Sequence, residues 1–204
     1  MLSSPTKTLG RNLGTTDTQK LLHQAIQQHA YSEAIDLLNQ LICQDANNSS
    51  YYSNRGLIHY HCQQWSQAIM DYSQALRLNP KNDSVYVRRA RCNTVLKHWK
   101  EAIADYDDAI RINPQNIRAR INQGILFREL GMHDDAIVCF DLALFMSQPS
   151  ATIYAERGRT YHLDGYWNYA MGDYQKSLEL LRKAPNQLLK LKLSTWLLQL
   201  LANQ

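Results

Sequence analysis

The sequence predicts an all-α fold, a solenoid of antiparallel helix pairs, and three observations support this. Residue types recur every 34 positions along most of the chain. Eight glycines and five prolines in 204 residues are too few for a sandwich or barrel with many tight turns. The apolar fraction of 45% and the charged fraction of 20% are those of a folded globular chain. We therefore expect most of the chain to form one helical array.

The period is clearest in columns of small and large residues. A column of alanines consists of Ala34, Ala68, Ala102, Ala136 and Ala170. Four positions later stand large side chains, namely Leu38, Tyr72, Tyr106, Phe140 and Tyr174. Twelve positions before the alanines a second small column holds Gly56, Ala90, Gly124 and Gly158. Small residues let two helices cross closely, and we expect the large ones to fill the space between successive units.

These columns divide the chain into five units of two helices each. We place the units at residues 15–48, 49–82, 83–116, 117–150 and 151–184. Pro80 and Pro114 end two of the second helices, because proline has no amide hydrogen for a continuing helix. Residues 1–14 are predicted to be a flexible segment, and residues 185–204 a capping helix.

The columns resemble the tetratricopeptide repeat (TPR) pattern over about residues 15–184. The resemblance implies a right-handed superhelix of helix pairs, with a concave groove lined by the first helix of each pair. It also implies a protein that binds other proteins and is not an enzyme. The first unit departs from the pattern at Leu22 and Leu41, and the fifth at Ser177, as solenoid ends do because they have one neighbour only.

No cluster of residues indicates catalysis or a cofactor. His59 and His61 are two positions apart on a predicted helix, so they point to different sides and cannot share a metal ion. Adjacent acidic residues such as Asp107 and Asp108 diverge in the same way. The phosphate-binding, dinucleotide-binding and nucleophile-elbow motifs are absent. We expect no catalytic residue, no metal and no cofactor.

The remaining sequence features favour a cytoplasmic protein. The four cysteines form no CxxC pair, which is typical of reduced thiols in a reducing compartment. The N-terminal residues lack the apolar stretch of a signal peptide, and no window is apolar enough for a membrane span.

The TPR resemblance places the candidate partner-binding residues on the first helices. They are Lys20, His23, Asn54, Leu57, Arg88, Arg91, Arg118, Asn122, Ile125 and Arg159. An arginine fork can bond both oxygens of a carboxylate, and an asparagine amide can bond an extended backbone. We therefore expect a protein partner, held through an acidic or C-terminal segment. The alternative is that these arginines are ordinary surface charges, and Glu129 and Glu156 oppose a uniformly basic groove.

The groove resembles the carboxylate clamp of chaperone-binding TPR domains only in part. Asn54 and Arg88 match that clamp, whereas Gln19, His23 and Ser84 depart from it. We therefore do not predict chaperone binding, and infer only a groove that favours an acidic or C-terminal peptide.

Two other functions stay open. A nucleic-acid binder would use the same arginines, but the net charge of +4 is modest and no aromatic row lines the groove. A homodimer could form through the C-terminal helix, whose packing face is Leu189, Leu193, Trp196, Leu197 and Leu200. Leu191, Leu198 and Leu201 lie outside that face, and they either pack on the fifth unit or bind a partner.

Overall fold

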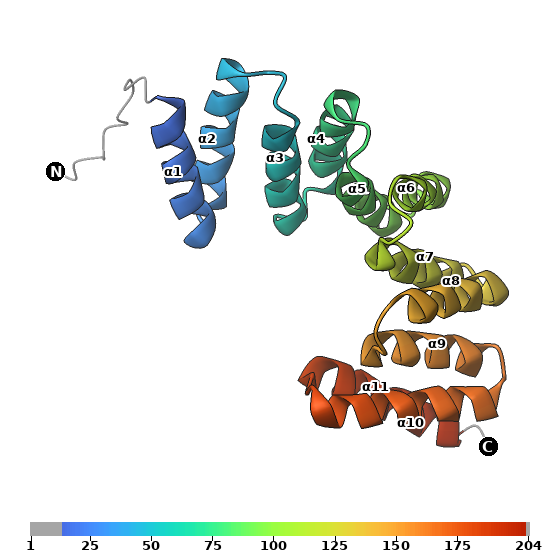
Figure 1. Cartoon of the computed structure of the whole chain (residues 1–204). Coiled ribbons are helices and arrows are strands. Elements are labelled where there is room, and N and C mark those ends of the chain that lie inside the picture. The colour runs from blue at the N-terminus through green and yellow to red at the C-terminus, as the bar shows by residue number, and fades with distance from the viewer. Residues whose placement is uncertain (1–13, 203–204) are drawn as a thin grey trace. The chain divides into compact units, whose positions relative to one another are not determined.

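The computed structural model describes residues 14–202, and these form helices without any strand (Figure 1). The predicted all-α fold of consecutive helix pairs is confirmed. The helices are α1 (Thr15–Gln27), α2 (Tyr31–Gln44), α3 (Ser49–His61), α4 (Trp65–Leu78), α5 (Asp83–Val95), α6 (Trp99–Ile112), α7 (Ile117–Glu129), α8 (His133–Met146), α9 (Ala151–Leu163), α10 (Trp167–Lys183) and α11 (Gln187–Ala202). The predicted flexible segment, residues 1–14, lies outside the described residues except for Gly14.

The chain divides into two compact units, Met1–Pro80 and Lys81–Gln204. The first unit contains α1 to α4, which pack as the pairs α1 with α2 and α3 with α4. The second unit contains α5 to α11, with the pairs α5 with α6, α7 with α8, and α9 with α10.

Specific residues start and stop these helices. The side chains of Asn48, Asn82 and Asn116 each accept a hydrogen bond from a backbone N–H in the first turn of α3, α5 and α7. As predicted, α4 and α6 end just before Pro80 and Pro114. The starts of α3, α5 and α7 and the ends of α4 and α6 thus follow from local side-chain chemistry.

The turn inside each pair uses one residue with left-handed backbone geometry. These residues are spaced by 34 positions, and their φ angles are 56° at His29, 59° at Gln63, 60° at Lys97, 76° at Gly131 and 83° at Gly165. Only glycine adopts this geometry without steric cost. The first three pairs therefore carry a small strain that the last two avoid.

The helices of a pair cross at the predicted small residues. All five alanines of the column are fully buried, and the large residues four positions later are at most 2% exposed. A methyl group added at Gly56 would lie 2.8 Å from the ring of Tyr72, and Gly124 and Gly158 are equally close to the facing rings of their own pairs. The large side chain thus packs on the small residue of its own helix pair, and it also contributes to the packing between units, since Phe140 clusters with Ile153 of α9.

The C-terminal helix α11 packs on α10 and α9. Leu189, Leu193 and Leu200 are buried, and Trp196 and Leu197 pack against them, so the packing face is the predicted one. Four other leucines of α11 are between 57% and 69% exposed, namely Leu188, Leu191, Leu198 and Leu201. The alternative in which all leucines outside the packing face also pack on the fifth unit is therefore wrong.

Candidate partner-binding surface

In the second unit, the first helices of successive pairs form an inner layer. α5 contacts α7, α7 contacts α9, and α9 contacts α11. Between residues 81 and 202, the second helices α6, α8 and α10 make no such contacts with one another. The layer whose members approach each other more closely lies on the inside of a curve. The inner face of this unit is therefore made by α5, α7, α9 and α11.

An ion pair crosses this inner layer. Arg128 of α7 donates from Nη1 to Oε2 of Glu156 on α9 at 2.6 Å, and to the backbone oxygen of the same residue at 3.2 Å. The two side chains are only 12% and 9% exposed. The carboxylate of Glu156, which opposed a basic groove in the sequence analysis, is thus neutralised by a neighbouring helix.

The candidate residue Arg159 is bound by the C-terminal helix. Its guanidinium donates from Nη1 to Oε1 of Gln199 at 2.8 Å and lies 5.6 Å from the ring centroid of Trp196. It also lies near His162, whose pKa is lowered by burial and then by the positive charge of Arg159. Sequence reasoning could not foresee this contact, because it joins positions 40 residues apart.

The other candidates of the second unit lie on α5 and α7. Arg91 and Arg118 are exposed, and Arg88 and Asn122 are half-buried. Ile125 is different, because it packs against a buried cluster that contains Phe140 of α8. The structure therefore brings three arginines and one asparagine to two adjacent inner helices and assigns Ile125 partly to the core.

The four remaining candidates lie in the first unit. Lys20 and His23 are exposed on α1, where Lys20 Nζ lies 3.7 Å from a carboxylate oxygen of Asp17 and His23 bonds an amide of the same helix at 2.9 Å. Asn54 is exposed and Leu57 half-buried on α3. Gln19 of α1 donates a hydrogen bond from Nε2 to the hydroxyl of Tyr51 on α3 at 3.1 Å, so the two helices that carry these candidates contact each other.

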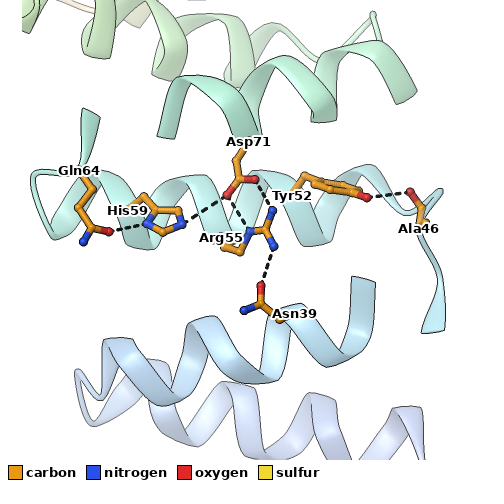
Figure 2. Close-up of polar contacts among 7 residues, drawn as sticks. All are labelled: Asn39, Ala46, Tyr52, Arg55, His59, Gln64 and Asp71. Atoms are coloured by element: carbon orange, nitrogen blue, oxygen red, sulfur yellow. Dashed lines mark hydrogen bonds and ion pairs between the residues drawn. The ribbon is translucent and has the colours of Figure 1, made fainter. Parts of the chain in front are cut away.

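The sequence analysis missed a set of ion pairs with the same 34-residue period. Figure 2 shows that Arg55 of α3 donates two hydrogen bonds to the carboxylate of Asp71 on α4, from Nε at 2.9 Å and from Nη2 at 2.6 Å. The same paired contacts join α5 to α6 and α9 to α10. The residues concerned are Arg89 with Asp105 and Arg157 with Asp173. We call these three contacts the arginine joints.

The aspartates of the arginine joints are buried, and the joints make further contacts with neighbouring helices. The three aspartates are between 4% and 7% exposed. In the first unit Nη1 of Arg55 reaches back to Oδ1 of Asn39 on α2 at 2.6 Å, and His59 lies 3.7 Å from Asp71 (Figure 2). In the second unit Arg157 reaches Asp141 of the preceding pair in the same way, also at 2.6 Å. Arg55 and Arg157 each connect three helices, and Arg89 connects α5 to α6, so we assign these arginines to the fold and not to ligand binding.

The fourth helix pair replaces the joint by uncharged groups. Gln123 and Cys139 stand at the corresponding positions, and the Sγ of Cys139 donates to Oε1 of Gln123 at 3.7 Å. Gln123 also donates to Asp107 of the preceding pair at 2.6 Å. Burial raises the pKa of the Cys139 thiol to about 11. A column of Arg55, Arg89, Gln123 and Arg157 in the sequence was the signal for these contacts.

The described residues show little that could perform chemistry. Burial raises the pKa of the Cys92 thiol to about 12, which is the opposite of an activated nucleophile. Between residues 14 and 202 no group of histidine, cysteine and acidic residues could hold a metal ion. In the same range, none of the helices combines the length and the apolar character that crossing a bilayer requires.

Comparisons with known proteins agree with this architecture. The family model described as "Tetratricopeptide repeat" matches residues 49–82. No curated protein sequence resembles the chain closely enough to count as a relative. A crystal structure of MamA shares 20% identity and a TM-score of 0.75, covering 83% of this chain and 92% of its own.

Two further solved structures have the same fold. YrrB, described as a TPR protein with an unusual peptide-binding site, gives a TM-score of 0.69 at 17% identity and covers 89% of this chain and 92% of its own. TTC0263, described as a thermophilic TPR protein in Thermus thermophilus, gives a TM-score of 0.70 at 18% identity, with coverage of 91% and 100%.

Proposed function

We propose that the chain is a tetratricopeptide repeat protein and a protein-protein interaction module, acting as an adaptor, scaffold or assembly factor and not as an enzyme. Its ligand is an acidic, extended segment of a partner protein, which lies on the inner face of the second unit. In this proposal residues 15–184 are the repeat array, and residues 185–204 cap it.

The observation that carries the proposal is the Arg128–Glu156 ion pair, with its 2.6 Å bond. Because Glu156 pairs with Arg128, it does not oppose the arginines of the two preceding first helices, Arg88, Arg91 and Arg118. The exposed Glu129 offsets one of them. Arginine suits carboxylates through its planar fork.

The half-buried Asn122 lies on the helix between the arginines of α5 and the residues of α9. Its amide can bond an extended backbone at both its donor and its acceptor. Acidic side chains in the ligand then give affinity, and the asparagine favours an extended conformation. YrrB, which shares the fold, is described as having a peptide-binding site.

The proposal is tested with short fluorescein-labelled peptide pools of three kinds, rich in Asp and Glu, in Asn and Gln, or in Lys and Arg. Fluorescence anisotropy should show binding of the acidic pool alone. The variant Arg88→Glu, Arg91→Glu should weaken it by at least about tenfold, since each hydrogen bond to a charged group contributes about 1.5–3 kcal/mol.

The matched control is Lys100→Glu, Arg111→Glu on α6, which makes the same change of net charge on the outer layer. It should bind as the wild type does. Equal loss in both variants would mean that net charge alone attracts the peptides, and the inner face would be the wrong site. A labelled single-stranded DNA that binds more tightly than every peptide, with a steep salt dependence, would favour a nucleic-acid binder instead.

A second candidate function is self-association through α11. The observation in its favour is the exposure of Leu191 and Leu198, at 67% and 69%. A soluble monomer rarely exposes several large apolar side chains on one helix face. Sedimentation velocity of the full chain at increasing concentration tests this, and a single monomeric species throughout contradicts it.

A further inference from the structure

The outer face of α8 carries a row of apolar residues, next to Asp141, which forms an ion pair with Arg157 of α9. Val138, Leu142 and Phe145 are spaced by four and three positions, so they lie on one side of the helix. Their exposed fractions are 55%, 40% and 89%. An almost fully exposed phenylalanine within such a row has no role in the core of this unit. We call these three residues the α8 stripe.

The other second helices of this unit carry ion pairs at the corresponding positions. Leu142 and Phe145 correspond in the repeat to Asp108 and Arg111 of α6, which bond at 2.7 Å. They also correspond to a lysine and a glutamate of α10, which bond at 2.8 Å. The fourth pair alone in this unit therefore presents a leucine and a phenylalanine where its neighbours present solvated charges. The repeat fold does not require an apolar pair at these positions.

A second apolar face of similar size lies on α11. Leu191 and Leu198 are seven positions apart, as are Val138 and Phe145 of the α8 stripe. Both separations amount to about 10 Å along a helix axis, at a rise of about 1.5 Å per residue. A helix carrying one row can therefore lie along a helix carrying the other, with both ends of each row in contact. α8 and α11 of the same chain make no contact within the described residues.

The charges beside the two faces are complementary. α11 carries Lys190 and Lys192 and has no acidic residue. α8 begins with the exposed Asp134 and Asp135 in its first turn. Two copies of α11 packed on each other would offer these lysines no counter-charge, whereas α8 does. When the leucines of α11 lie parallel to the α8 stripe, the lysines come within about one helical turn of the two aspartates.

We propose that α11 of one copy docks on the α8 stripe of a second copy. The inference rests on the proposed self-association and names the surface that receives α11. Because the two surfaces differ, the interface is heterologous, and a pair of copies keeps one free α8 stripe and one free α11 face. Such a contact forms rings or open chains of copies, not a closed two-fold dimer.

Complementation between two variants of the full chain tests the inference. Phe145→Glu removes the stripe, and Leu198→Glu removes the α11 face. Both side chains are exposed, so the far-ultraviolet circular dichroism of each variant should match the wild type. Each variant alone should sediment as a monomer. An equimolar mixture should form a one-to-one dimer, because the Phe145→Glu copy still offers α11 to the intact stripe of the Leu198→Glu copy.

The outcomes separate this inference from the one on which it rests. A Phe145→Glu variant that associates like the wild type, beside a monomeric Leu198→Glu variant, overturns the α8 surface and leaves self-association through α11 intact. A wild-type chain that is monomeric at every concentration overturns both. A mixture that stays monomeric also overturns the inference.

Charge reversal gives an independent measurement. Asp134→Lys, Asp135→Lys should weaken association at low salt, and adding Lys190→Glu, Lys192→Glu to the same chain should restore it. Failure of the second pair to restore association contradicts the parallel placement of the lysines.

Discussion

The arginine joint of the first unit gives a prediction with a definite size. Arg55→Gln leaves the carboxylate of Asp71, which is 6% exposed, without its two-bonded partner. Removing one member of a fully buried ion pair costs about 3–5 kcal/mol. The side chain of Arg55 is 22% exposed, so water reaches the vacated space. We therefore expect a loss of about 2–3 kcal/mol in the free energy of unfolding.

The fourth helix pair supplies the compensating change. The double variant Arg55→Gln, Asp71→Cys installs the pair found at Gln123 and Cys139. It removes the buried charge together with its partner, so it should be more stable than Arg55→Gln alone by about 1–2 kcal/mol. Urea unfolding followed by far-ultraviolet circular dichroism measures both single variants and the double variant, and gives the coupling energy of the cycle.

An exposed pair of the same chemistry is the control. Asp108 and Arg111 of α6 bond at 2.7 Å with side chains 39% and 70% exposed. Arg111→Gln should cost no more than about 0.5 kcal/mol. If Arg55→Gln costs as little as this control, or if the double variant loses the sum of the two single losses, burial of the joint does not determine its stability and the reasoning is refuted.

Three other outcomes follow from the packing, the turns and the buried histidine. Gly56→Ala should lower the free energy of unfolding by about 1–2 kcal/mol, because the new methyl group would lie 2.8 Å from the ring of Tyr72. Gly172→Ala should instead raise it by about 0.5–1 kcal/mol, because no atom lies within 4 Å of the new methyl group and alanine favours the helix. Gln63→Gly and Lys97→Gly should each raise the melting temperature, since glycine relieves the positive φ angles of 59° and 60°, and a decrease would show that side-chain contacts outweigh this strain. Burial lowers the pKa of His162 below 6.5 in the folded chain. As the pH falls, the imidazole therefore binds a proton in the unfolded chain before it does so in the folded chain. The free energy of unfolding should then decrease as the pH drops from 6.5 towards the lowered pKa. His162→Gln should flatten that slope in urea titrations, and an unchanged slope would assign it to other groups.

The fold could be predicted because the residues that repeat every 34 positions are those that pack in the core or end a helix. A buried alanine, a large side chain four positions later and a proline after the second helix each have one structural reason. Those contacts are made within a helix pair or with the next helix along the chain, so they can be read from one stretch of sequence. The turn positions His29, Gln63 and Lys97 escaped notice because nothing in a polar side chain signals a positive φ angle.

The candidate surface was less predictable, because the charged residues there form ion pairs with residues of other helix pairs. Glu156 counted as a groove charge in the sequence, but Arg128 of another helix neutralises it. Arg159 counted as a ligand-binding residue, but Gln199 already accepts its hydrogen bond. The period could have revealed Arg55 and Asp71 as partners, since the same two residue types recur 34 positions later.

The bond from Arg159 to Gln199, 2.8 Å long, also bears on how long a bound segment can be. A peptide lying across α5 and α7 next meets α9, where the last arginine is held by the chain's own C-terminal helix. Under the proposed function, residues added to the peptide beyond α7 would therefore bring no new arginine contact. In the proposed binding mode, the module would distinguish partners by where their acidic stretch ends as well as by its charge.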